Sequence, residues 1–209
     1  MAEALGGTDC LVAHGLISDT DVVLKDGSTL RLREQRPDGA GSIRALLEGL
    51  SPESRAVRFL SAGVDLNRSA QLLSRDDGAS SVGLLALPGD STQVAGQGIF
   101  IRSSPGRAEI AFTVADALHS KGIGSILLDQ LAQADSTVGI EMFDATVHPE
   151  KIAMLDVFSH SGLAVRVSSE PGLVRLAFPT AMTEEGAHAF ERREESAAAA
   201  AVRARRPVG

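Results

Sequence analysis

Alternating hydrophobic and polar residues predict that strands make up much of this chain. Two alternating runs within Val22–Arg33 flank Asp26-Gly27, and such a pair is typical of a β-hairpin. Two apolar runs on either side of a Pro-Gly-Asp-Ser turn predict a second antiparallel pair. The strands expected after the first hairpin are Ser81–Leu87, Val94–Ile101, Arg107–Val114, Gly139–Val147, Leu163–Val167 and Leu173–Phe178.

Apolar residues at helical spacing predict helices between these strands. Ser51 as N-cap and Pro52 in the first helical position are a typical helix start, and Gly162 is typical of a position just past a helix end. The order of elements predicts an α/β fold, with a mixed, mostly antiparallel sheet flanked by helices and one crossover unit at its centre. The expected helices are Gly41–Leu50, a segment from Pro52 through Leu60, Ser69–Leu73, Gly122–Ala134 and a segment from His148 through Phe158.

The two ends of the chain differ from its middle. Residues 1–20 show no sustained periodicity and contain Gly6 and Gly7, so we expect a flexible leader. Residues 180–209 are rich in Ala, Glu and Arg, and we expect a helical connector that leads to a further domain. Residues 21–179 remain as one domain, which suits a chain of 209 residues.

Composition excludes several classes of protein. The net charge of −7 argues against a nucleic-acid partner, because phosphate backbones select basic surfaces. No apolar run approaches the roughly 20 residues of a membrane helix, and the amino terminus lacks a secretory pattern, so we expect a cytoplasmic protein. Cys10 is the only cysteine, which excludes an intramolecular disulfide, and no pair of histidines has metal-ligand spacing, so we expect no metal.

A turn with two glycines, Gly122 and Gly124, lies between an expected strand and an expected helix. Glycines let consecutive N–H groups converge, and the helix start adds unpaired donors, so the turn suits a phosphate. It is not a P-loop, because Lys121 precedes the glycines, and not a dinucleotide fingerprint, because Leu127 occupies the third glycine position. The turn by itself is equally compatible with a strand-to-helix connection that binds no ligand.

The residues around the turn resemble the GNAT superfamily of N-acetyltransferases, whose pyrophosphate loop has the pattern Gln/Arg-x-x-Gly-x-Gly/Ala; His119 stands at its first position. Val114 stands where that superfamily ends the strand that binds the pantetheine arm. The segment from Glu150 to Leu163 is similar to the superfamily's Glu-Asn-x-x-Met…Gly-Phe segment, with Lys151 in the place of Asn. The resemblance runs from about residue 22 to 178 and implies the GNAT fold.

Within the superfamily, the chain is most similar to the bacterial protein lysine acetyltransferases. The supporting stretches are Leu50–Arg55, Arg58-Phe59, Ala108–Phe112 and the tail from Thr183 to Ala201. In many members of that family the acyltransferase domain is fused to a domain that resembles an ADP-forming acyl-CoA synthetase. The resemblance therefore implies that this chain is the catalytic part of a larger multidomain enzyme.

The resemblance also implies a set of site residues. A lysine amine has a pKa of about 10.4, so acyl transfer at neutral pH needs a base, and the family's catalytic glutamate corresponds to Glu109; an exposed strand carboxylate is the alternative. A backbone N–H near Phe112 to Val114 would stabilise the carbonyl oxygen. His119 and Lys151 either contact the cofactor or are solvated. The residues expected to bind acetyl-CoA are Phe112, Thr113, Val114, His119, Ser120, Lys121, Gly122, Ile123, Gly124, Ser125 and Lys151.

The chain contains no tyrosine, so the acid that many GNAT enzymes use for the leaving thiolate is missing, and no general acid is assigned. With no suitable cysteine, direct transfer is favoured over an acyl-enzyme. The function expected first is protein lysine N-acetylation from acetyl-CoA, with the active-site lysine of an AMP-forming acyl-CoA synthetase as acceptor. Two alternatives stay open, namely a GNAT enzyme acting on a small amine and a non-catalytic module that senses acyl-CoA.

Overall fold

The computed structural model describes residues 17–181, except residues 25, 62, 151, 160 and 162, together with residue 188. Lys151, Gly162 and most of the expected leader and connector therefore lie outside the described residues. The strands are β1 (Thr20–Val23), β2 (Thr29–Glu34), β3 (Ser81–Pro88), β4 (Gly96–Ser104), β5 (Arg107–Val114), β6 (Met142–Val147), β7 (Arg166–Glu170) and β8 (Leu173–Pro179). The helices are η1 (Pro37–Gly39), α1 (Ala40–Glu48), α2 (Pro52–Phe59), α3 (Leu66–Leu73), η2 (Asp116–Leu118), α4 (Ile123–Val138) and α5 (Ile152–Ser159).

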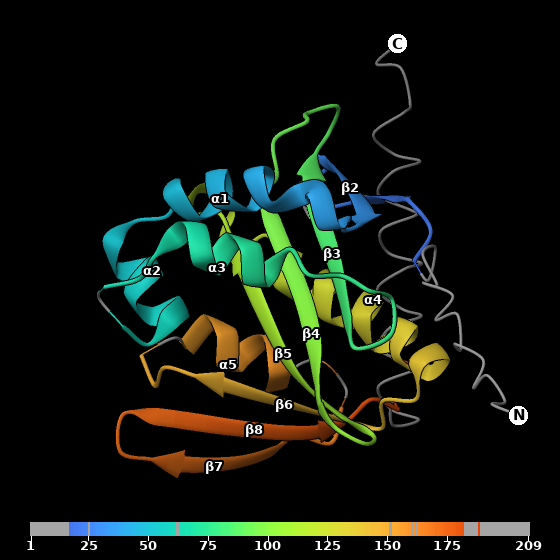
Figure 1. Ribbon diagram of the computed structural model, residues 1–209, viewed down its shortest axis with the longest axis vertical. Coiled ribbons are helices and arrows are strands. Elements are labelled where there is room, and N and C mark those ends of the chain that lie inside the picture. The colour runs from blue at the N-terminus through green and yellow to red at the C-terminus, as the bar shows by residue number, and fades with distance from the viewer. Residues whose placement is uncertain are drawn as a thin grey trace, which may run out of the picture.

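The strands form one eight-stranded sheet in the order β1-β2-β3-β4-β5-β6-β8-β7 (Figure 1). Every neighbouring pair is antiparallel except β5 and β6, which are parallel and are joined by α4. The predicted fold class, a mixed and mostly antiparallel sheet with one central crossover, is confirmed. The order of the last two strands was not predicted: β8 lies between β6 and β7, where it can bury Leu176 and Phe178.

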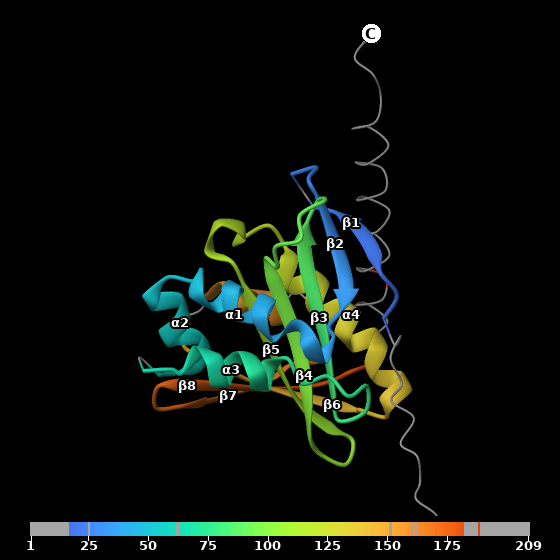
Figure 2. The ribbon, with the colours of Figure 1, turned by 45° about the horizontal axis from the view of Figure 1, so that its top comes forward.

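Helices cover both faces of the sheet. Helices α1 and α3 lie on one face and α4 lies behind the other, as Figures 1 and 2 show from two directions. Each face has its own hydrophobic core. The core under α4 includes Leu127, Phe143 and Phe178, and the core under α1 and α3 includes Ile43, Leu47 and Leu85. Ile17, which we expected in the leader, is buried in the core under α4.

The predicted start of α2 is confirmed. Pro52 is its first residue, and the Ser51 hydroxyl accepts a hydrogen bond from the Ser54 N–H at 3.1 Å. Two other predicted helix starts are wrong. Helix α3 begins at Leu66, three residues early, because Asp65 caps it.

The expected helix from His148 begins only at Ile152, because residues 148–150 form a turn in which the His148 ring accepts the Glu150 N–H. The strand expected from Gly139 begins at Met142. Both differences shorten an element at its start, where sequence patterns are least informative.

A buried polar cluster ties α3 to the middle of the sheet. The Gln35 and Gln97 amides both donate to the Leu73 carbonyl, at 2.7 and 2.9 Å, and Gln97 also donates to Gln35 at 2.6 Å. Gly83 lies against this cluster, and a Cβ there would stand 2.7 Å from the Gln35 side chain. A larger residue at position 83 would therefore displace the buried Gln35 amide from this cluster.

The loop between α3 and β3 depends on Asp77, and this predicts a pH-dependent part of the stability. Asp77 accepts the N–H groups of Ala79, Ser80 and Ser81 at 3.0, 2.6 and 3.0 Å. Burial opposes ionisation, but these bonds and the Ser80 hydroxyl outweigh it and lower the pKa of the carboxyl to about 2. The stabilisation is therefore present above the unfolded pKa of about 4 and is lost as pH falls towards 2.

We expect Asp77→Asn to reduce the free energy of unfolding by about 1 kcal/mol at pH 7, a value discounted because Asp77 is exposed. Urea unfolding at pH 7, 5, 4 and 3 measures the difference, which should narrow below pH 4. Asp90→Asn is the control, because its exposed carboxylate faces Arg31 at 3.8 Å. If Asp77→Asn lowered the free energy of unfolding by the same amount at every pH, the charge of Asp77 would not be what stabilises the loop.

Candidate active site

The parallel strands β5 and β6 are paired at one end only. Arg107, Ala108 and Glu109 pair with residues 142–144, and no pairing continues beyond Glu109 and Asp144 within these two strands. In contrast, β5 stays paired with β4 as far as Val114. The two ribbons consequently fan apart from their common end in Figure 1, and one backbone edge of β5 has no pairing partner on β6 there.

Two residues of β5 direct backbone groups into this gap. The Ala115 N–H donates to the Ala95 carbonyl of the chain segment before β4 at 2.8 Å. Because backbone groups alternate in direction along an antiparallel strand, Thr113 also faces β4, where it is opposite Gln97. The N–H and C=O groups of Phe112 and Val114 therefore face away from β4, into the gap. Of the three strand positions expected to bind acetyl-CoA, two lie on that edge.

The glycine turn follows β5 and η2 directly. Gly122 has a φ of 85° and Ser120 a φ of 63°, so the chain reverses through left-handed backbone. The Ile126 N–H bonds the Gly122 carbonyl at 3.1 Å, so the N–H groups of residues 122–125 precede the first helical bond of α4. Within the part of the chain that the structure describes, these four N–H groups have no acceptor. They form a ready site for an anion.

The two glycines of the turn serve different needs. A Cβ at Gly122 would meet no atom within 4 Å, so the space beside it is open. A Cβ at Gly124 would stand 3.3 Å from a methyl group of Val157 on α5. Gly124 therefore lets α5 pack closely against the start of α4, whereas Gly122 supplies the backbone conformation and leaves room for a ligand.

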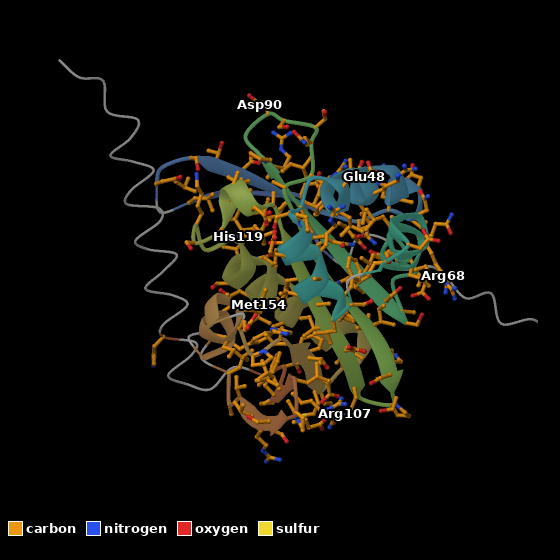
Figure 3. All side chains as sticks on the ribbon, turned by 90° about the vertical axis from the view of Figure 1, so that its left-hand side faces the viewer. Glu48, Arg68, Asp90, Arg107, His119 and Met154 are labelled. Carbon is orange, nitrogen blue, oxygen red and sulfur yellow. The ribbon has the colours of Figure 1, made fainter. Side chains whose placement is uncertain are left out.

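Both basic side chains expected at the turn have partners within the chain. The His119 ring lies 3.0 Å from the Val114 carbonyl and 3.6 Å from the Asp116 carboxylate. Lys121 donates to Asp26 at the tip of the β1–β2 hairpin, at 2.8 Å. In Figure 3 this hairpin lies beside the turn that carries His119, and Arg107, labelled at the start of β5, lies at the far end of the strand.

Glu109 lies on the opposite face of β5 from α4, at the last position where β5 and β6 pair. Its side chain is exposed, whereas its neighbours Ala108 and Ile110 are buried in the core under α4. The residue opposite Glu109 on β6 is Asp144, whose carboxylate is held by the Arg107 guanidinium through bonds of 3.0 and 2.5 Å. Glu109, the expected base, thus has an accessible carboxylate at the start of the gap, whereas the carboxylate of Asp144 is bound by Arg107.

Arg58 of α2 reaches the same face of β5, a position that the sequence pattern does not indicate. It donates to the Thr113 hydroxyl at 2.9 Å and interacts electrostatically with Glu109. Burial lowers the pKa of the Arg58 guanidinium to about 10, partly offset by Glu109, so the group stays cationic at neutral pH. Arg58 therefore fastens α2 to β5 next to Glu109.

Asp116 of η2 fastens the other end of α2. Its carboxylate accepts the Ser51 N–H at 2.7 Å, at the start of that helix. Burial raises the pKa of Asp116, but hydrogen bonds from Ser54 and Ser51 and the nearby His119 outweigh this and hold it below its ordinary value. Asp116 thus links the residues next to the glycine turn to the helix that borders Glu109.

An open groove of about 480 Å³ borders α2 on this side of the molecule. Its walls come from α2, the loop between β6 and α5, and the β7–β8 turn, and they include the carboxylates of Glu53 and Glu150. Phe158 is buried and packs on Phe112 and Phe178 at centroid distances of 6.1 and 5.3 Å. Phe158 supplies no proton donor.

Two further properties concern only the described part of the chain. No group of three His, Cys, Asp or Glu side chains gathers there in a way that suits a metal ion. None of the helices there is long and apolar enough to cross a membrane.

Comparison with known proteins finds acetyltransferases, although no protein-family model matches the chain. Acetyltransferase Pat of Mycolicibacterium smegmatis is 29% identical over 163 residues, which are 76% of this chain and 48% of the relative. The chain thus spans about half the length of that curated relative. Among solved structures, RimJ of Mycobacterium smegmatis in complex with CoA-disulfide shares the fold, with a TM-score of 0.57 at 18% identity over 84% of this chain and 93% of RimJ.

The crystal structure of the GNAT domain of S. lividans PAT is more informative. It is 31% identical, with a TM-score of 0.69, and the match covers 77% of this chain and 96% of that domain. Similarity at this level over nearly a whole domain, together with the sheet order and the parallel pair that opens beside the glycine turn, assigns the family. The chain belongs to the GNAT superfamily of N-acetyltransferases and is an acyltransferase.

Proposed function

We propose that this domain transfers an acetyl group from acetyl-CoA directly to a lysine amine of a protein, with Glu109 as the general base. The observation that carries the proposal is the position of Glu109, which is accessible at the last paired residue of β5, where the gap to β6 begins. The Phe112 and Val114 backbone groups face that gap. A base and a row of backbone donors thus lie along one strand.

The glycine turn supports acetyl-CoA as the co-substrate, which GNAT acetyltransferases use. The N–H groups of residues 122–125 suit a pyrophosphate, and the open space at Gly122 leaves room for it. Val114 ends β5 near this turn, since the His119 ring bonds its carbonyl. A molecule with a phosphate group at one end and a peptide-like arm would therefore extend from the turn along the free edge of β5.

The transfer step needs only Glu109, the backbone of β5 and solvent water. Glu109 accepts a proton from the lysine ammonium, and the neutral amine attacks the thioester carbon. The oxyanion that forms is stabilised by a backbone N–H on the free edge of β5, of Phe112 or Val114. The attacking nitrogen then loses its second proton to solvent water as the C–S bond breaks, and CoA leaves as a thiolate that solvent protonates, because the pKa of a free thiol is about 8.5.

The acceptor proposed first is the active-site lysine of an AMP-forming acyl-CoA synthetase. Support comes from the sequence resemblance to the bacterial protein lysine acetyltransferases. The similarity to the GNAT domain of S. lividans PAT and to acetyltransferase Pat, of whose length this chain covers about half, supports an acetyltransferase. The groove beside α2 is open and is lined by Glu53, Glu150 and His148, and its two carboxylates favour a cationic side chain over an anionic one. We further propose that the intact enzyme is a cytoplasmic multidomain protein.

Incubation with acetyl-CoA and an AMP-forming acyl-CoA synthetase tests this function. We expect intact-mass analysis to show the addition of one acetyl group, and peptide mapping to place it on the active-site lysine. A synthetase with that lysine replaced by arginine is the control and should gain none. Thiol release with a panel of small amines but not with the protein would instead identify a small-molecule acetyltransferase, and binding of acetyl-CoA with no transfer would identify a sensing module.

A further inference from the structure

Lys121 is the only lysine next to the glycine turn in the sequence, and its ammonium group already has a carboxylate partner. It donates to a carboxylate oxygen of Asp26, 95 positions earlier in the chain, at 2.8 Å. Asp26 belongs to the β1–β2 hairpin, which is far from the turn in the sequence but lies beside it in the fold. The lysine that directly precedes the N–H groups that suit a phosphate thus already has an anionic partner.

We propose that Asp26 competes with a phosphate group of acyl-CoA for Lys121, so that the β1–β2 hairpin sets how strongly the domain binds the nucleotide end of its co-substrate. This inference rests on the proposed function, in which the turn binds CoA. It adds a residue that lies outside the turn and lowers affinity. Asp26 is thereby a residue that determines the strength and selectivity of co-substrate binding.

The hairpin holds the Asp26 carboxylate in place. One oxygen accepts both the N–H and the hydroxyl of Ser28, at 3.0 and 2.5 Å. The bond from the Gly27 N–H to the Leu24 carbonyl, at 2.9 Å, and that from the Leu24 N–H to the Ser28 carbonyl, at 2.8 Å, close the turn around it. The other oxygen meets Lys121. The carboxylate is therefore presented to Lys121 by a fixed backbone.

The charge of Asp26 persists at any pH at which the enzyme would work. Its hydrogen bonds to Lys121 and Ser28 hold the pKa of the carboxyl far below its ordinary value. A phosphate group that approached the free N–H groups of residues 122–125 would meet this negative charge and a lysine already paired with it. Removing the charge therefore favours phosphate binding in two ways, by less repulsion and by a free ammonium group.

The exchange of partners is not costly, because the ion pair is exposed. The Lys121 and Asp26 side chains keep 36% and 43% of their surface accessible, and ion pairs of this kind are weak. A phosphate that carries more charge and also meets the backbone N–H groups can displace the carboxylate. The carboxylate thus weakens co-substrate binding by a small factor without preventing it, and a ligand without phosphates gains nothing from its removal.

Direct binding measurements on the full chain test the inference. Titration calorimetry with CoA, 4′-phosphopantetheine and pantetheine compares ligands that share the arm and differ in phosphates. We expect Asp26→Asn to bind CoA about two- to fivefold more tightly, the range that a weak surface pair allows, and to bind pantetheine unchanged. Asparagine can still accept the Ser28 N–H, so the hairpin should keep its shape.

Two further variants make the result specific. Asp21→Asn removes a carboxylate of the same hairpin that pairs with Arg31 at 3.2 Å, and it should leave CoA affinity unchanged. Lys121→Met should weaken CoA binding. In the Lys121→Met protein, Asp26→Asn should increase the affinity for CoA by a smaller factor than it does in the unmodified protein, because the competition for Lys121 is gone.

Unchanged or weaker CoA binding by Asp26→Asn would overturn the inference while leaving the proposed function intact. An equal gain for pantetheine would also overturn it, because the effect would not come from phosphates. If the unmodified protein bound neither CoA nor 4′-phosphopantetheine, the proposed co-substrate site would fail, and this inference with it.

Discussion

Replacing Glu109 by glutamine should lower kcat for acetyl transfer by about 10²- to 10⁴-fold at neutral pH, the usual contribution of a general base. The amide keeps the size of the side chain but cannot take a proton from the lysine ammonium. Glu109 is exposed at the end of the β5–β6 pairing, so the change buries nothing and leaves the sheet intact. The glycine turn is on the far side of Val114, so the dissociation constant for CoA should stay within about twofold.

The pH dependence separates a base from a residue that only shapes the site. A lysine amine loses its own proton as the pH approaches its pKa of about 10.4, so the deficit of Glu109→Gln should shrink between pH 7 and 9.5. Single-turnover rates of acetyl transfer across that range measure it. A constant deficit at all pH values would indicate a structural role.

Asp144→Asn is the matched control, since Asp144 stands opposite Glu109 on β6 and its carboxylate is already held by Arg107. We expect it to lose less than tenfold in kcat, because an ion-paired carboxylate is a poor base. If Asp144→Asn lost more activity than Glu109→Gln, the assignment of the base to Glu109 would be wrong.

Local patterns predicted the elements of this fold well, because their signals are short in range. The Asp26-Gly27 hairpin, the Ser51-Pro52 helix start and the strand-turn-helix unit around Gly122 each depend on residues within a few positions of one another. The position of β8 between β6 and β7 depends instead on where in the sheet its residues Leu176 and Phe178 become buried. A periodicity of two cannot distinguish these pairings.

The candidate site also combines residues that the sequence indicated with contacts that it did not. The resemblance to a family gave roles to Glu109 and the glycine turn, and the structure places both at the gap between β5 and β6, although their roles remain predictions. The pairs Arg58–Thr113 and Lys121–Asp26 join residues 55 and 95 positions apart. These are polar residues without periodicity, so no pattern in one sequence connects them. Arg58 did stand in a family-like stretch, which was the available signal.

The phosphate site can be tested by comparing two glycines of the same helix. Gly122 and Gly139 flank α4 at its two ends, with φ values of 85° and 71°, and a Cβ at either would meet nothing within 4 Å. Alanine at each position therefore costs backbone strain of about 1 kcal/mol and causes no clash. We expect Gly122→Ala and Gly139→Ala to lower the free energy of unfolding by similar amounts in urea titrations.

Only Gly122→Ala should affect the co-substrate, because its methyl group would enter the open space beside the free N–H groups of residues 122–125, and the strain would misalign them. We expect its dissociation constant for CoA to rise about tenfold or more, the effect of losing one or two hydrogen bonds to a charged group. Gly139→Ala should bind CoA as the unmodified protein does. Equal affinities in the two variants would mean that the turn connects β5 to α4 without holding a phosphate, since any effect through stability is matched between them.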